Sequence, residues 1–198
     1  MIIKLINLEY SLNKQFNQFG KQSIMKIYLL FIFFCLGFKQ AYFSQDIFDV
    51  CRKGDKEALK EIIKSNPKIV NETNDGGFTP LIVAGYRNQI EIVKILLENN
   101  ADINAKSGEG SVLMGACYKG EMEMVKLLLE KGAEVNTDND LGTTPLMYAI
   151  LAGNMELIKL LLEHGAKKDV KERSGKTAID YAKQIDNQEI VKLLNSFH

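Results

Sequence analysis

This 198-residue sequence contains no tryptophan and is poor in metal-ligating side chains, with three cysteines and two histidines. The cysteines, Cys35, Cys51 and Cys117, are too few and too widely spaced for a disulfide framework. No two of them stand at the spacing of zinc ligands, and His164 and His198 add little to such a site. We therefore expect no bound metal and no cofactor.

An excess of charge of one sign is also missing, since 25 Lys and Arg balance 25 Asp and Glu. Nucleic-acid affinity comes mainly from clustered Lys and Arg, so we expect no nucleic-acid partner. The 46% of hydrophobic residues argues equally against disorder. The distribution is uneven, because residues 1–45 contain five lysines and one acid, whereas residues 46–198 contain 20 basic and 24 acidic side chains.

Residues 25–45 have the pattern of a secretory signal peptide. A lysine follows Met25, residues 27–38 are apolar without a charge, and a polar exit follows. Twelve residues form a helix of about 18 Å, well short of the roughly 30 Å hydrocarbon core of a bilayer. We expect export to the periplasm or outside the cell, with cleavage near Ser44 or Gln45 and no stable membrane span afterwards. The alternatives are an uncleaved signal that tethers the protein to the membrane, and a buried core helix.

Residues 1–24 fit neither the charged start of a signal peptide nor a domain. Our hypothesis is that they are an upstream extension and that translation starts at Met25. A peptide from this segment in the natural protein would contradict the hypothesis.

Residues 46–198 repeat one unit every 32 or 33 residues. Two sets of equivalent positions show this most clearly. The first set is Leu81, Leu113, Leu146 and Ile179, and the second set is Ala84, Ala116, Ala149 and Ala182. In each unit a short helix and a left-handed turn precede a second, broadly apolar helix. The residues expected at the turn are Asn88, Gly120, Gly153 and Asp186.

The motifs Thr79-Pro80-Leu81-x-x-Ala84 and Thr144-Pro145-Leu146-x-x-Ala149, with Gly132-Ala133-x-Val135-Asn136 closing a unit, resemble ankyrin repeats. The resemblance implies an all-α ankyrin-repeat solenoid of about five stacked helix-turn-helix units joined by short β-turn or hairpin loops. The expected units are residues 46–73, 74–105, 106–138, 139–171 and 172–198, with the first and last as caps.

The sequence departs from the family pattern in the third unit. Glu109 stands where a turn glycine is expected, and Val112 replaces the proline of the motif. We expect the loop of residues 106–110 to be the most irregular in the stack.

The resemblance also implies that a partner protein lies against the concave face, formed by loop tips and the ends of the first helices. The corresponding residues here are Arg52, Lys53, Tyr86, Arg87, Tyr118 and Lys119 at the helix ends, and Phe78, Asp140 and Leu141 at the tips. We expect tyrosine anchors and cationic steering to bind an acidic or polar segment of that partner. The alternative is that these residues are simply solvated helix ends.

No catalytic constellation is visible in the sequence, so we expect a monomeric, non-catalytic interaction module, an exported adaptor or inhibitor. Cys51 and Cys117 fall two units apart and are expected to be buried free thiols. Two other functions stay open. One is an accessory stabiliser or immunity-like partner of an exported enzyme, and the other is an enzyme with an unrecognised site.

Overall fold

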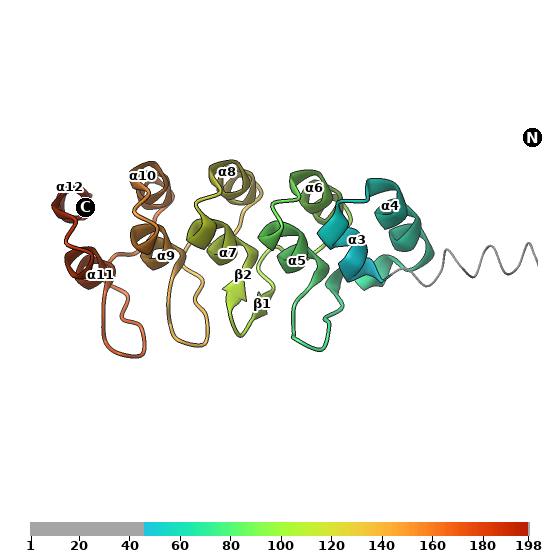
Figure 1. The fold of residues 1–198 in the computed structure, drawn as a ribbon, viewed down its shortest axis with the longest axis horizontal. Coiled ribbons are helices and arrows are strands. Elements are labelled where there is room, and N and C mark those ends of the chain that lie inside the picture. The colour runs from blue at the N-terminus through green and yellow to red at the C-terminus, as the bar shows by residue number, and fades with distance from the viewer. Residues whose placement is uncertain (1–45, 198) are drawn as a thin grey trace, which may run out of the picture. The chain divides into compact units, whose positions relative to one another are not determined.

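The computed structural model describes residues 46–197, so the expected signal peptide and upstream extension lie outside the described residues. Ten α-helices, a 3₁₀ helix and two short strands make up this part of the chain (Figure 1). The elements are α3 (Ile47–Lys53), α4 (Lys56–Ser65), η1 (Pro67–Asn71), α5 (Pro80–Tyr86), α6 (Ile90–Glu98), β1 (Lys106–Ser107), β2 (Gly110–Ser111), α7 (Val112–Lys119), α8 (Met122–Glu130), α9 (Pro145–Leu151), α10 (Met155–Glu163), α11 (Ala178–Gln184) and α12 (Gln188–Ser196). Among these helices none is long and apolar enough to cross a bilayer.

The helices form five antiparallel pairs that stack in a row, with the loops between pairs projecting to one side (Figure 1). Each first helix packs against the first helix of the next pair. This arrangement confirms the predicted all-α solenoid of five helix-turn-helix units.

Hydroxyl caps start the first helices of units two to five. The side-chain oxygens of Thr79, Ser111 and Thr144 accept a hydrogen bond from the backbone N–H three residues later, at 3.3–3.5 Å. Thr177 caps α11 in the same way and completes a capping box with Asp180. Pro80 occupies the first helical position of α5, where its missing N–H has no helical partner to lose.

Left-handed residues end the first helices, as the sequence predicted. The φ angles are 54° at Asn88, 72° at Gly120, 67° at Gly153 and 54° at Asp186. The chain can therefore reverse within two or three residues, and the second helix lies against the first.

A continuous apolar spine joins the five units. Leu81, Leu113 and Leu146 are each 1% exposed, and each contributes roughly 1.5–3 kcal/mol to the free energy of unfolding. Ala84 and Ala149 are fully buried between neighbouring first helices. Because their side chains are single methyl groups, these helices can approach closely. Because each pair buries its second face only against its neighbours, the stack is stable as a whole.

Asparagine side chains connect successive units outside this spine. Asn71 Nδ2 donates to the carbonyl of Asn100 at 3.0 Å, and Asn71 Oδ1 accepts from the N–H of Asp102 at 2.8 Å. Asn136 makes the same two bonds to the next unit, at 3.0 and 2.8 Å, and Asn104 makes the accepting bond at 2.9 Å. We call these contacts the asparagine joints, and each fixes the turn after one second helix to the unit before it.

The loop of the third unit differs from the other three. Elsewhere a side-chain oxygen of Asn74, Asn139 or Glu172 accepts the backbone N–H groups two and four residues later. The third unit has Lys106 at that position, which offers no acceptor. Strands β1 and β2 pair there instead, with Lys106 opposite Ser111. The loop departs from the rest as predicted, but the prediction of irregularity is wrong, because the departure is a regular two-stranded hairpin.

Candidate binding groove

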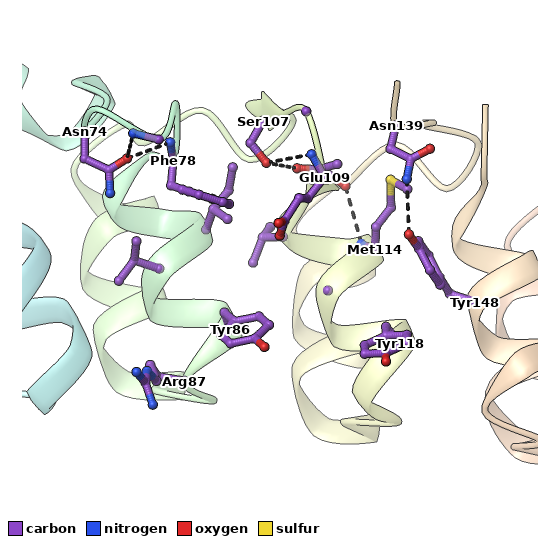
Figure 2. Close-up of a pocket in the computed structure, with 18 of the residues that line it drawn as sticks. Asn74, Phe78, Tyr86, Arg87, Ser107, Glu109, Met114, Tyr118, Asn139 and Tyr148 are labelled. Atoms are coloured by element: carbon purple, nitrogen blue, oxygen red, sulfur yellow. Dashed lines mark hydrogen bonds between the residues drawn. The ribbon is translucent and has the colours of Figure 1, made fainter. Parts of the chain in front are cut away.

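A groove of about 630 Å³ runs along the side on which the first helices meet the loops. Helices α5, α7 and α9 supply one wall, and the loops that precede them supply the other (Figure 2). The groove is therefore formed mainly by units two, three and four, with Arg52 of the first unit in its lining, and no single unit could form it.

Two tyrosines stand at the helix wall because of where their helices end. Tyr86 is the last residue of α5, and Tyr118 is the penultimate residue of α7. The core-facing positions of both helices are already filled, so the rings point out and are 51% and 60% exposed. At the loop wall Leu141 is 57% exposed. Side chains of this size and exposure, gathered in one groove, are typical of binding surfaces.

The structure gathers most of the predicted binding residues in this groove. Its lining includes Arg52, Phe78, Tyr86, Arg87, Tyr118 and Leu141. The other predicted residues, Lys53, Lys119 and Asp140, do not line it.

Two of the predicted steering cations already have partners in the free protein. Lys119 Nζ lies 3.9 Å from the centroid of the Tyr86 ring and donates to the Tyr86 carbonyl at 2.6 Å. Arg52 pairs with Asp49 one helical turn earlier. Lys119 thus holds the Tyr86 ring in place, and its charge is less available for steering a partner than the sequence suggested.

Asp140 lies among the loop tips and not in the groove lining. Its backbone N–H donates to the carbonyl of Gly108 at 3.3 Å, which ties the fourth loop to the hairpin of the third. Together with Lys106, Asp138 and Arg173 it lines a polar hollow between loop tips. Both signs of charge are present there, and Lys106 and Asp138 pair at 3.2 Å.

Glu109, Gly115 and Tyr148 are among the groove residues that were not predicted from the sequence. Gly115 lies inside α7, and a Cβ atom there would have no neighbour within 4 Å. Val83 and Tyr148 hold the same position in the flanking units. The missing side chain therefore hollows the groove between them, and reading this column of the repeat would have found it.

Tyr148 is fixed at the far end of the hollow. Its ring meets that of Tyr118 edge-on, with centroids 5.5 Å apart, and its hydroxyl accepts a hydrogen bond from Asn139 Nδ2 at 3.1 Å. Burial, and to a smaller extent the negative charge of Glu109, raises the pKa of the Tyr148 phenol. The phenol is consequently protonated at neutral pH and can act as a hydrogen-bond donor in the groove.

The two cysteines of the described residues lie in the core. Cys51 and Cys117 are free and buried, and burial raises the pKa of the Cys51 thiol to about 12 and also raises that of Cys117. A thiol is nucleophilic as its thiolate, so neither is reactive near neutral pH. Within residues 46–197 no cluster of His, Cys, Asp and Glu could hold a metal ion.

Comparison with known proteins agrees with the repeat pattern. A family profile described as ankyrin repeats, three copies, matches residues 47–107 and 113–197. The chain is 39% identical over 59 residues to ankyrin repeat and SAM domain-containing protein 6 of Rattus norvegicus, which is 30% of this chain and 7% of that protein. It is 38% identical over 71 residues to DNA-binding protein RFXANK of Homo sapiens, or 35% of this chain and 27% of that protein.

A palmitoyltransferase, akr1 of Schizosaccharomyces pombe, is 40% identical over 63 residues, which are 32% of this chain and 10% of that enzyme. The similarity concerns the ankyrin region of that protein. This chain thus matches a small part of each of these relatives.

Proposed function

This chain belongs to the ankyrin repeat family, whose repeats are protein–protein interaction modules, and from that premise we propose that it is an exported adaptor or inhibitor that binds one partner protein in the groove. Ankyrin repeat domains are in general not catalytic. Two questions follow: which surface of this chain binds the partner protein, and in which compartment the two proteins meet.

The exposed tyrosines carry the first part of the proposal. Tyr86 and Tyr118 occupy a position that Arg52 and Leu151 hold in other units, so the stack itself does not require an aromatic ring there. Tyrosine is a frequent anchor of binding energy at interfaces, because it buries a large ring at a small cost in side-chain entropy. The lysine that holds Tyr86 in place reduces that cost further.

A photo-crosslinking experiment in the natural host tests this surface. Benzoylphenylalanine replaces Tyr118 in the groove or, as the matched control, Lys126 on the exposed side of α8. We expect the first variant to capture one protein that the second does not. Capture from position 126 alone, or equal capture from both, would place the interface elsewhere.

The captured partner then allows a direct measurement of affinity. The double variant Tyr86→Ala/Tyr118→Ala should raise the dissociation constant at least about tenfold. Calorimetry with the purified partner provides the measurement, and circular dichroism shows whether the variant keeps its helices. An unchanged dissociation constant in a folded variant would contradict the role of the groove.

Export is the second part of the proposal and rests on the residue pattern of 25–45. Expression with a C-terminal tag, followed by cell fractionation and sequencing of the mature N-terminus, tests it. We expect the mature protein outside the cytoplasm, beginning near Ser44 or Gln45. A cytoplasmic protein that retains residues 25–45 would refute export without affecting the proposed interface.

A further inference from the structure

The groove is hollow beside Gly115, and we call this part of it the Gly115 pocket. It is bounded by Val83 and Tyr86 of α5, by Tyr118 of α7 and by Tyr148 of α9, with Glu109 at its loop end. A Cβ atom at Gly115 would meet no neighbour within 4 Å, so the floor of the pocket is open. The pocket thus has room for one side chain of a partner.

Glu109 gives this pocket its charge. Its side chain extends from the hairpin of the third unit into the groove between α5 and α7 (Figure 2). The backbone N–H of Glu109 donates to Ser107 Oγ at 3.3 Å, which fixes the start of the side chain. Among the described residues its carboxylate makes no ion pair, and it is exposed to solvent.

The nearby cations do not neutralise this carboxylate. Lys119 stacks on the Tyr86 ring and donates to the Tyr86 carbonyl. Arg52 is paired with Asp49. Arg87 follows the last residue of α5, about 10 Å along the helix from the end that faces the loops (Figure 2).

These surroundings select the chemistry of the occupant. A purely apolar side chain would cover the Glu109 carboxylate without offering it a hydrogen bond, which is unfavourable. An acidic side chain would be repelled by the carboxylate. An arginine or lysine can place its stem against Val83 and the tyrosine rings, and its charged end can reach the carboxylate and the ring faces.

We propose that the Gly115 pocket binds a single cationic side chain, arginine or lysine, of the partner protein. The inference rests on the proposed function for the protein nature of the ligand and adds the residue that the groove selects. It differs from the acidic or polar segment expected from the sequence, because Glu109 enters the groove whereas Lys119 is already bound.

Short peptides test the pocket without knowledge of the partner. The probes are acetyl-Gly-X-Gly-amide peptides in which X is arginine or lysine, or the neutral analogues citrulline and norleucine. Binding is followed by nuclear magnetic resonance through the backbone amide of Gly115. We expect saturable shifts with the cationic peptides at millimolar concentration, and an at least about tenfold weaker affinity for the neutral ones.

Two variants and one control assign the effect to the pocket. Glu109→Gln removes the charge and should weaken arginine-peptide binding about tenfold, and Gly115→Leu fills the open space and should abolish it. Asp140→Asn removes a carboxylate outside the groove and should leave the affinity unchanged. The amide spectra of the variants report whether each stays folded.

Three results would overturn the inference. They are an absence of saturable shifts with the arginine and lysine peptides, equal or tighter binding of norleucine, and an affinity insensitive to Glu109→Gln. If crosslinking locates the partner at Tyr118 while Glu109→Gln leaves partner binding unchanged, the proposed function stands and the pocket assignment fails. If crosslinking locates the partner elsewhere while the peptides bind as expected, the pocket's preference for a cationic side chain stands, but its role in binding the partner and the proposed interface both fail.

Discussion

Two columns of residues lie one position apart in the first helices, and they differ completely in how much they vary. In units two to five the core column consists of Ala84, Ala116, Ala149 and Ala182, and the groove column consists of Val83, Gly115, Tyr148 and Tyr181. Core-column residues are at most 1% exposed and touch the neighbouring unit, so that a larger side chain would push the helices apart. Groove-column residues are only partly buried, and side chains as different in size as glycine and tyrosine fit there. Variation within a repeat column therefore identifies the surface that is free to serve binding.

The same contrast exists between two glycines. A Cβ atom at Gly85 of α5 would collide with Cγ2 of Val112 in the next unit, whereas one at Gly115 would lie in open space. Neither glycine has a positive φ, so backbone conformation does not require either of them. The absence of a side chain at Gly85 allows two units to pack closely, whereas its absence at Gly115 leaves space in the groove.

Removal of a core side chain should have the largest effect. Leu128 of α8 is fully buried, and Leu128→Ala should lower the free energy of unfolding by about 2–5 kcal/mol, because it leaves a cavity that the stack cannot close. Urea unfolding followed by circular dichroism provides the measurement. The control is Leu141→Ala at the groove, where 57% exposure predicts a change within about 0.5 kcal/mol. Similar losses in the two variants would break the distinction between core and groove.

Gly85→Ala should have the next largest effect. Alanine favours a helix over glycine, yet here its methyl group would collide with Val112 and force α5 and α7 apart. We expect the free energy of unfolding to fall by about 1–2 kcal/mol, and Gly85→Ala combined with Val112→Ala to lose less than the sum of the single variants. Additive losses would show that the two residues do not limit each other.

Gly115→Ala should have the opposite effect to Gly85→Ala on the free energy of unfolding. The methyl group enters open space inside α7, so the ordinary helix preference for alanine applies, and the free energy of unfolding should rise by about 0.5–1 kcal/mol. Urea unfolding under the conditions used for Gly85→Ala gives the comparison. A loss of stability would mean that the hollow is filled or strained in solution.

The smallest effect near neutral pH concerns Cys51, which is fully buried in α3. Burial raises the pKa of its thiol from 9.0 in the unfolded chain to about 12. Since the folded-state pKa is the higher one, the stability linked to this group is fully present below pH 9 and is lost as pH rises towards 12. We expect stability to fall less steeply above pH 9 in Cys51→Ala than in the unaltered protein, as measured by urea unfolding. Equal slopes would indicate a thiol that is accessible in the folded state.

The repeat period was enough to predict the fold, because the recurrence of Leu81, Ala84 and their counterparts every 32 or 33 residues indicates similar helix pairs packed on one another. The groove was harder to predict, since its chemistry depends on contacts between units. Lys119 belongs to α7 but is bound to Tyr86 of α5, and its position in the sequence gives no sign of that contact. Glu109 was recognised as an unusual loop residue, yet its entry into the groove follows from the hairpin of β1 and β2, which replaced the expected irregular loop.

The asparagine joints have a consequence for how such a protein can change in evolution. A tandem duplication of about 33 residues carries its own asparagine and its own acceptor turn, so both new boundaries reproduce a joint that already exists. Where the copied unit carries the asparagine, as at positions 71, 104 and 136, the array can thus lengthen or shorten by whole units while these bonds between units are kept. Point substitutions in the groove column can then give each added unit a different ligand preference.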